Sequence, residues 1–288
     1  MQPIPQEADA FKSAMRAAWD GAAEGWDRHG PAIRDWLSSA TEALLDAAQI
    51  GPGARVLDLA AGAGDQTIDA ARRVGPSGSV LATDLSDAIL DIAARHAREQ
   101  GLTQIRTRQA DLENPGLDGE TFDAAVCRLG LMFCRDPSRA LRSVHSVLAP
   151  GGRFAALVFS EPARNPCVGI AISTALSHAG LPLRDPFEPG ALMSLGRPGL
   201  LESLMRDAGF VDVRATKLAA PFRLPSAADY VEFLRSSTPP LRAALARLDE
   251  SDRKQAWADI ERKLEAFRTD DGWEGPNELL LVSGARES

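Results

Sequence analysis

The chain has 288 residues, of which 44% are hydrophobic and 25% are charged, a balance typical of a globular protein rather than a disordered or fibrous one. Its formal net charge is −8, and no run of Lys and Arg occurs, so long-range repulsion would oppose a broad contact with a phosphate backbone. We therefore expect no nucleic-acid partner.

The cysteine count and the amino terminus indicate a reducing compartment. Cys127, Cys134 and Cys167 are an odd number without C-x-x-C spacing, which fits neither a disulfide framework nor a zinc site. Three thiols could gather a metalloid such as arsenite, but Cys127 falls in an apolar strand, where cysteine usually acts as a small hydrophobic residue. The start lacks the basic stub and apolar run of a signal peptide, and no stretch approaches the roughly 18 apolar residues of a membrane span. We expect a cytoplasmic protein with no membrane span and no metal site.

Only helical patterns precede Gly51. The first contains Phe11, Met15 and Trp19, and the second begins at Pro31, since proline is favoured at a first helical position. We expect residues 1–50 to form a helical amino-terminal extension that caps the rest.

From residue 51 to residue 160, short β-rich runs alternate with helical patterns, which is typical of βαβ units and a parallel sheet. The predicted strands are 55–59, 79–84, 105–109, 122–127 and 153–159, and the predicted helices are about 66–74, 87–99 and 137–148. This segment is the expected core.

The remainder is predicted to alternate insertions with core elements. Residues 161–199 form a lid insertion whose helix has Asn165 as its N-cap and Pro166 as its first residue, and residues 200–224 add a core helix and a sixth strand at about 210–218. Residues 225–272 form a second helical insertion with helices beginning near Ser226 and Ser251, and residues 273–288 supply the seventh strand. The predicted fold is α/β: a Rossmann-like, doubly wound, mainly parallel seven-stranded sheet with the helical extension and two lid insertions.

The strongest motif is the run from Val56 to Thr67, VLDLAAGAGDQT, which predicts a strand, a loop of small residues and a helix start. Small residues remove side chains where a ligand would approach, and Gly62 and Gly64 can adopt backbone angles closed to other residues. This pattern is typical of a cradle for a nucleotide-like ligand.

Charge favours one ligand over another. In an alignment with the dinucleotide fingerprint G-x-G-x-x-G, Thr67 takes the place of the third glycine. Asp58, near the end of the first strand, would repel a diphosphate, whereas S-adenosylmethionine carries an ammonium and a sulfonium. We therefore expect S-adenosylmethionine rather than NAD.

Two further acids follow the next two strands. Asp84 lies 22 residues beyond Gly62, the distance from which a carboxylate can bridge ribose hydroxyls, although it could instead be a turn residue before a helix. Asp111 follows the third strand and could accept a hydrogen bond from an adenine amino group.

These residues, with Phe122-Asp123 and the run Leu148 to Gly152, resemble class I S-adenosylmethionine-dependent methyltransferases, and within them the ubiquinone/menaquinone biosynthesis C-methyltransferases and natural-product relatives. The resemblance implies that residues 60–64 contact the methionine part of the donor, Asp84 the ribose, and Asp111 with Leu112 the adenine. It also implies that Arg128 and Leu129 lie near the reacting methyl group. Ala60 departs from the glycine usual in the family. The predicted donor-binding residues are Asp58, Ala60, Ala61, Gly62, Gly64, Gln66, Thr67, Asp84, Leu85, Ala110, Asp111, Leu112, Arg128 and Leu129.

The acceptor is expected to be a small, largely apolar molecule, with Trp26, Met132, Phe133 and Phe187 as wall residues. Oxygen, carbon and nitrogen all remain open as the methylated atom, and so does a homodimer. A base is optional for methyl transfer from a sulfonium; His29, Arg128 and His178 are the catalytic candidates. Two rival classes remain: an S-adenosylmethionine-binding enzyme that does not methylate, and a non-catalytic cofactor-binding or interaction module.

Overall fold

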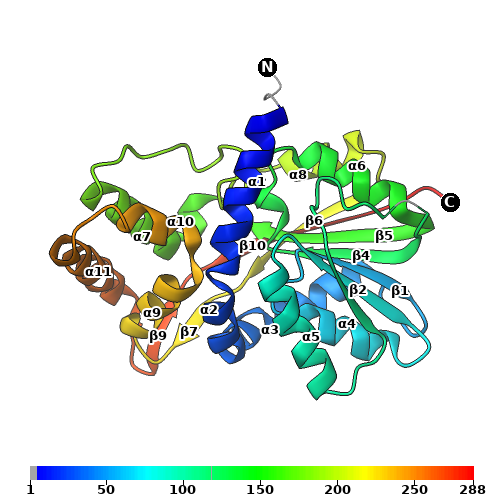
Figure 1. The fold of residues 1–288 in the computed structure, drawn as a ribbon, viewed down its shortest axis with the longest axis horizontal. Coiled ribbons are helices and arrows are strands. Elements are labelled where there is room, and N and C mark those ends of the chain that lie inside the picture. The colour runs from blue at the N-terminus through cyan, green and yellow to red at the C-terminus, as the bar shows by residue number, and fades with distance from the viewer. Residues whose placement is uncertain (1–4, 118) are drawn as a thin grey trace.

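A seven-stranded sheet forms the centre of the computed structural model, which describes residues 5–117 and 119–288 (Figure 1). The strand order is β3-β2-β1-β4-β5-β10-β6, and only β10 runs antiparallel to its neighbours. The predicted mainly parallel, seven-stranded fold is thus confirmed. The strands are β1 (Arg55–Leu59), β2 (Ser79–Asp84), β3 (Ile105–Gln109), β4 (Phe122–Arg128), β5 (Leu148–Phe159), β6 (Val211–Ala219) and β10 (Glu278–Ala285).

Helices cover both faces of this sheet, as a parallel sheet with fully buried strands requires. One face carries α3 (Gly30–Ala47), α4 (Asp65–Val74) and α5 (Asp87–Glu99), and the other carries α6 (Pro137–Val147) and α8 (Leu200–Asp207) (Figure 1). Two of these helices have side-chain N-caps. The Ser86 hydroxyl accepts from the backbone N–H of Ile89 at the start of α5, and the Asp136 carboxylate accepts from the backbone N–H of Arg139 at the start of α6.

A second group of elements stands beside the sheet. It contains η2 (Pro162–Arg164), α7 (Pro166–His178), α9 (Ala227–Ser237), α10 (Pro239–Leu245), α11 (Glu250–Leu264) and η3 (Glu265–Phe267) (Figure 1). It also contains a small sheet of order β7-β9-β8, formed by β7 (Phe222–Leu224), β8 (Arg268–Thr269) and β9 (Gly272–Gly275). This sheet was not expected from the sequence; its β8–β9 hairpin turns at Asp270 and Asp271.

Of the three helix starts expected in the insertions, the one at Ser226 is confirmed, and the ones at Ser251 and Asn165 differ in detail from the structure. The Ser226 hydroxyl accepts from the N–H of Asp229 and caps α9 as predicted, but the α11 cap is Asp249, which accepts from the N–H of Asp252, rather than Ser251. Aspartate and serine are about equally favoured at an N-cap, so the sequence allows either start. Asn165 precedes α7 but makes no cap bond. Its amide nitrogen instead donates to Glu278 O, joining η2 to β10.

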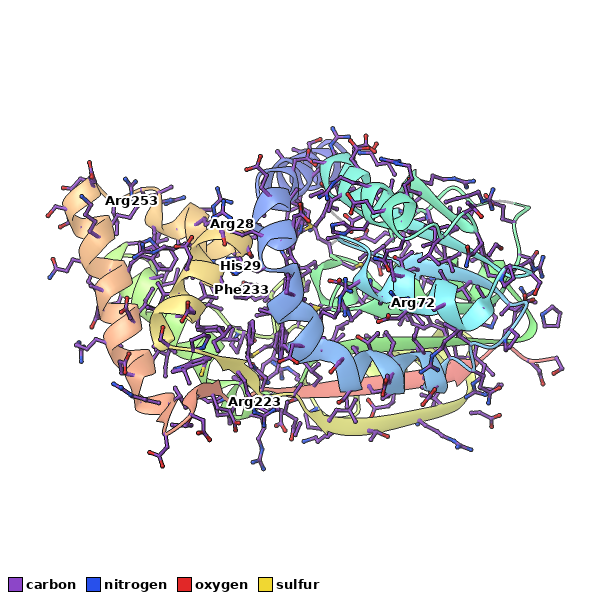
Figure 2. All side chains as sticks on the ribbon, turned by 90° about the horizontal axis from the view of Figure 1, so that it is seen from below. Arg28, His29, Arg72, Arg223, Phe233 and Arg253 are labelled. Atoms are coloured by element: carbon purple, nitrogen blue, oxygen red, sulfur yellow. The ribbon has the colours of Figure 1, made fainter. Side chains whose placement is uncertain are left out.

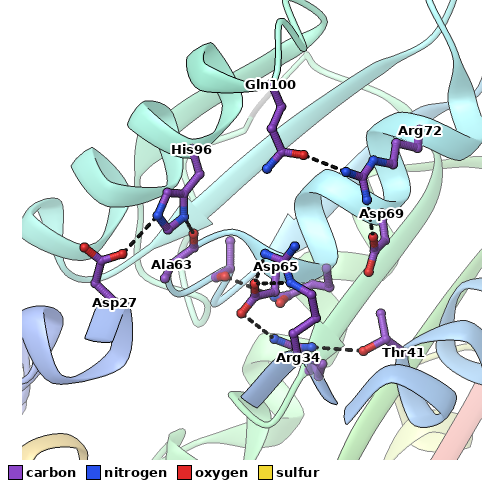
Figure 3. Close-up of polar contacts among 12 residues, drawn as sticks. Asp27, Arg34, Thr41, Ala63, Asp65, Asp69, Arg72, His96 and Gln100 are labelled. Carbon is purple, nitrogen blue, oxygen red and sulfur yellow. Dashed lines mark hydrogen bonds and ion pairs between the residues drawn. The ribbon is translucent and has the colours of Figure 1, made fainter. Parts of the chain in front are cut away.

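The amino terminus supplies α1 (Pro5–Asp20) and a short helix, α2 (Ala23–Arg28), that the sequence did not predict as separate. The contact of α2 with α9 is close, because a Cβ at Gly25 would lie 2.3 Å from the carbonyl oxygen of Ser236. On its other side, Asp27 Oδ1 lies 2.9 Å from His96 Nε2 of α5, and His96 Nδ1 lies 3.1 Å from the carbonyl oxygen of Ala63 (Figure 3). Thus α2 is fixed between the second group of elements and the main sheet.

Candidate functional site

One cavity lies at the carboxyl ends of β1, β2, β3 and β4, with α1 and α2 on its far side. Its empty space is about 1090 Å³, counting the part that is open to solvent. Open α/β sheets bind ligands at this edge. The residues that line it are Phe11, Lys12, Met15, Trp19, Trp26, Leu37, Ala60, Ala61, Gly62, Ala63, Asp65, Gln66, Thr83, Asp84, Leu85, Ile89, Ala110, Asp111, Leu112, Glu113, Arg128, Leu129, Gly130, Phe133 and Cys134.

The loop after β1 has the backbone conformation that its small residues predict. Gly62 has a φ of +56° and Gly64 a φ of +90°, both in the left-handed region that glycine adopts without strain. Gly64 is also required by packing, since its Cβ would lie 2.9 Å from the Cβ of Ala93 on α5. Ala60 has a φ of +52°, which costs an L residue roughly 1 kcal/mol. The departure from glycine at this position therefore carries a modest conformational cost.

Asp84 joins this loop to the end of β2. Its Oδ2 accepts a hydrogen bond from the N–H of Gly62 at 3.0 Å, and its Oδ1 accepts one from the N–H of Ser86 at 3.0 Å. Burial raises the pKa of Asp84, and the backbone hydrogen bonds oppose that shift. Asp84 is thus both a turn residue and a wall of the cavity, so the two interpretations of the sequence are compatible.

Asp111 lies in the turn after β3, where its Oδ1 accepts from the N–H of Glu113 at 3.0 Å. Its Oδ2 pairs with the ammonium of Lys12 on α1, which also lies 3.0 Å from Glu113 Oε2. The Asp20 carboxylate, at the other end of α1, accepts a hydrogen bond from the Ser86 hydroxyl. Helix α1 is therefore fastened to the ends of both β2 and β3.

Asp58 does not face the cavity. It is fully buried, its Oδ2 accepts from the Thr67 hydroxyl, and its Oδ1 accepts from Gln66 Nε2 at 3.2 Å. Burial raises its pKa to about 7, although both hydrogen bonds favour the ionised form. The expectation that this carboxylate meets a ligand directly is wrong, because the first turn of α4 covers it. Its position instead organises Gln66, which does line the cavity.

A charged cluster lies where Asp58 had been expected to act. Asp65, the first residue of α4, accepts from Arg34 Nη2 at 2.7 Å through Oδ1 (Figure 3). Its Oδ2 lies 3.8 Å from Nη2 of Arg128, and Arg128 Nη1 donates to the Thr41 hydroxyl at 2.9 Å. Asp65 and Arg128 line the cavity.

The opposite wall is apolar and aromatic. Phe11, Met15 and Trp19 come from one face of α1, Trp26 from α2, and Phe133 from the 3₁₀ turn η1 (Leu131–Phe133). The Trp19 ring lies edge-on to Phe133 at 5.4 Å and tilted against Trp26 at 6.2 Å. Among the predicted wall residues, Trp26 and Phe133 lie here.

Four other predicted site residues lie elsewhere. The described lining does not include Met132, whose carbonyl accepts from the Ser194 hydroxyl, or Phe187, which stacks under Arg197 at 4.4 Å. His29 packs edge-on against Phe233 at the junction of α2 and α9 (Figure 2), and burial lowers its pKa. His178 Nε2 lies 3.3 Å from Asp259 on α11. Neither histidine reaches the cavity.

Among the predicted donor-binding residues, Gly64 and Thr67 are also absent from the described lining, while the remainder apart from Asp58 line it. The sequence reasoning missed Lys12, Asp65 and Glu113. Asp65 stands in the loop motif itself, next to Gly64, and is a residue that the motif could have indicated. No sequence pattern indicated that Lys12 and Glu113 belong to the site, because only the docking of α1 brings them together.

Comparison with known proteins gives the following matches. A family model described as "Methyltransferase domain" matches residues 56–152. The chain is 40% identical over 119 residues to the ubiquinone/menaquinone biosynthesis C-methyltransferase UbiE of Idiomarina loihiensis, an alignment that covers 41% of this chain and 47% of that protein. Its identity to UbiE of Haemophilus ducreyi is 30% over 192 residues, covering 61% of this chain and 71% of that protein.

The first of these curated relatives match the chain over about half of their own length. Among solved structures, the YcgJ protein from Bacillus subtilis has a TM-score of 0.57 at 18% identity, covering 87% of this chain and 99% of that chain. That structural similarity supports the Rossmann-like fold described above. Within the described residues, no helix combines the length and apolar character needed to cross a membrane.

Proposed function

Because the chain belongs to the class I S-adenosylmethionine-dependent methyltransferases, we propose that it transfers the methyl group of this donor to oxygen, carbon or nitrogen of a small, largely apolar molecule. One observation carries the proposal: a single cavity has the polar cradle of residues 60–63, Asp84 and Asp111 on one side and the aromatic wall of α1, α2 and η1 on the other. Two molecules can therefore meet in it, one polar and one apolar.

The residues of the cradle fit the donor chemically. Residues 60–63 carry no side chain larger than a methyl group, so a ligand can approach their backbone closely. The Asp84 and Asp111 carboxylates offer acceptors for ribose hydroxyls and for an adenine amino group. When bound, S-adenosylmethionine supplies a methyl group on a positively charged sulfur that is itself a good leaving group.

The chain's own contribution is alignment and exclusion of water. The aromatic wall holds an apolar acceptor against the cradle, and α1, fastened by Lys12 and Asp20, covers the space between them. The two histidines predicted as bases lie outside the cavity, so we propose that proton removal, where an acceptor needs it, does not depend on them.

We also propose the division of the chain. Residues 51–160, 200–224 and 273–288 form the donor-binding core, and residues 1–50 form the part of the cap that faces the acceptor. The insertions 161–199 and 225–272 contribute no residue to the described lining, and the second supports the cap through the contact of α9 with α2. Support comes from α1 and α2, which supply most of the aromatic wall. We propose a cytoplasmic location because Cys127, Cys134 and Cys167 are all free.

Incubation with methyl-labelled S-adenosylmethionine and fractionated small-molecule extracts, read by mass spectrometry, tests the proposal. Label in a small molecule supports it, and label in protein or RNA contradicts the acceptor class. Tight donor binding without transfer to any fraction would favour a non-methylating enzyme or a binding module. At donor concentrations below saturation, Asp84→Ala should lower labelling strongly, whereas Asp123→Ala, which removes an acid paired with Arg55 at the opposite end of the sheet, should not.

A further inference from the structure

His96, in the last turn of α5, lies between the loop after β1 and helix α2 (Figure 3). Its Nε2 lies 2.9 Å from Oδ1 of Asp27 on α2, and its Nδ1 lies 3.1 Å from the carbonyl oxygen of Ala63. Ala63 belongs to the cradle for the donor, and Asp27 directly follows Trp26 of the aromatic wall. One imidazole ring, which is not part of the described lining, therefore joins the two sides of the cavity.

Both partners of the His96 ring are hydrogen-bond acceptors. A carbonyl oxygen can only accept, so the contact with Ala63 requires a proton on Nδ1. The Asp27 carboxylate also accepts, and its other oxygen pairs with the guanidinium of Arg95. A neutral imidazole has one N–H and would turn a lone pair toward one of these two oxygens. Both contacts are hydrogen bonds only when each ring nitrogen carries a proton.

The position of His96 suits a cation. The ring lies in the last turn of α5, where the helix dipole favours positive charge, and its side chain is 20% exposed. The adjacent cation, Arg95, is itself paired with carboxylates on both sides. Charged groups surround the ring from each of the neighbouring helices: Asp27 from α2, Arg95 and Glu99 from α5, the Arg72–Asp69 pair from α4, and Asp20, bonded to Ser86, from α1.

Helix α2 depends on its neighbours for its position. It has six residues, too few for a stable isolated helix. Toward α9 it is held by the close packing of Gly25 and by the bond from Trp26 Nε1 to the last residue of that helix. Toward α5, both ion pairs that join the two helices within the described residues use Asp27. The contact with His96 is the one that continues from Asp27 to the cradle.

The cradle is equally dependent on α5. Ala93 precedes His96 by three residues and therefore lies on the same side of the helix. A Cβ at Gly64 would lie 2.9 Å from the Cβ of Ala93, so the loop after β1 packs directly on this side of α5. The neighbouring carbonyl, of Ala63, accepts from His96. A ligand that fixes the loop thus also fixes the ring.

We propose that His96 is a positioning residue that couples the cradle for the donor to the wall for the acceptor, and that its ring does so when both nitrogens carry protons. The inference rests on the proposed function. A donor on residues 60–63 fixes the Ala63 carbonyl, and through the ring it fixes Asp27 and the adjacent Trp26. An acceptor that orders α2 must in return strengthen donor binding by the same factor. Because histidine exchanges its second proton within the physiological pH range, the coupling is lost as pH rises.

Hydrogen exchange measured by mass spectrometry, with the demethylated product S-adenosylhomocysteine as the probe, tests the coupling without a known acceptor. In the wild-type protein the probe should slow exchange of the backbone amides of residues 23–29. Without the probe, His96→Leu should speed this exchange about 3- to 10-fold, the factor for one hydrogen bond, and adding the probe should then leave it unchanged. His145→Leu, which alters a histidine of α6 that packs on Phe210, is the matched control and should behave as the wild type.

Two outcomes of this experiment would overturn the inference. If the probe still slows exchange of residues 23–29 in His96→Leu, the ligand orders α2 directly rather than through the ring. If the wild-type protein binds the probe without any change in these amides, the cradle and the wall are not coupled. Failure of the wild-type protein to bind the probe in calorimetric titration would instead contradict the proposed function.

The role of the proton has a separate test that does not require His96→Leu to fold. Protection of residues 23–29, corrected for the intrinsic exchange rate, should fall severalfold in the wild type between about pH 5.5 and about pH 9. Asp27→Asn should remove this dependence, because its amide nitrogen can donate to a deprotonated Nε2 while its oxygen accepts from Arg95. Asp27→Ala should lose the protection at every pH. Constant protection in the wild type, or an unaltered pH dependence in Asp27→Asn, would overturn the inference.

Discussion

The ammonium of Lys12 on α1 pairs with the carboxylate of Asp111 at the end of β3, so the helix that covers the cavity is tied to the residue predicted to contact the adenine. The same ammonium lies 3.0 Å from Glu113. Burial alone would lower the pKa of Lys12, but its hydrogen bonds to both carboxylates and their charges together outweigh burial, so the pKa is raised. In the proposed function, the carboxylate that holds α1 over the cavity is also the one that would contact the donor.

We expect Lys12→Met to increase the dissociation rate of the donor severalfold and to weaken its binding by about 0.5 to 1 kcal/mol, the scale of a partly exposed ion pair. Because salt screens such pairs, raising the salt concentration should speed dissociation from the wild-type protein and have less effect on the variant. Stopped-flow measurement of dissociation checks this. Lys254→Met, which removes an exposed pair with Glu250, is the control and should change nothing. Identical salt dependence in Lys12→Met and the wild type would contradict the role of this pair.

Asp84→Ala should weaken binding of S-adenosylmethionine by about 1.5 to 3 kcal/mol, because it removes an acceptor for the ribose and also the bond that fixes Gly62. Calorimetric titration measures the change. Asp123→Ala removes an acid at the other end of the sheet and should leave affinity unaltered. A change of only a few tenths of a kcal/mol in Asp84→Ala would reduce Asp84 to a turn residue.

The raised pKa of the buried Asp58 carboxyl leads us to expect a pH dependence of the free energy of unfolding. Its folded-state pKa of about 7 lies above the unfolded value of about 3.9, so between these values the folded protein keeps a proton that the unfolded chain releases. The free energy of unfolding should therefore fall as pH rises from about 4 to 7. Asp58→Asn should flatten this dependence by about 4 kcal/mol across the window, since the shift spans about three pKa units and each corresponds to about 1.4 kcal/mol.

Urea unfolding at a series of pH values measures this effect. Asp123 provides a control of opposite sign, because Arg55 lowers its pKa and its contribution is lost as pH falls. Asp123→Asn should thus alter the acid end of the profile. An Asp58→Asn profile parallel to that of the wild type would show that Asp58 does not hold the proton.

Trp26→Ala should lower turnover about 10- to 100-fold while donor affinity changes less than about twofold, since acceptor alignment and water exclusion depend on this wall. Its Nε1 also donates to Ser237 O at 3.0 Å, so thermal unfolding must show that the variant is folded. Trp36→Ala is the matched control: Trp36 stacks on Phe222 at 4.6 Å and is not part of the described lining. Full turnover and unchanged acceptor KM in folded Trp26→Ala would make Trp26 a packing residue.

The core could be predicted from the sequence because its information is local. Short β-rich runs such as Ser79–Asp84 depend on nearby residues, and all seven strands of the main sheet occur within a few residues of their expected positions. The direction in which a side chain points within a motif is different. Asp58 was expected to face the ligand, but Thr67 and Gln66, nine and eight residues later, turn back over it.

The cap was predicted less well because it depends on docking between distant segments. The spacing of Phe11, Met15 and Trp19 indicates an apolar helix face but not the surface that it covers. His178 pairs with Asp259, 81 residues away, and no spacing rule connects them. The same holds for Arg34 and Arg128, which become neighbours only through Asp65.

The close contact at Gly25 affects how the acceptor pocket can diverge during evolution. Any side chain at this position would push α2 away from Ser236 on α9, and Trp26, the next residue, would move with it. A mutation at a residue that lines no part of the described cavity would then reshape the wall that an acceptor meets. Divergence in acceptor choice can therefore begin at the packing between α2 and α9, while the cradle for the donor stays unchanged.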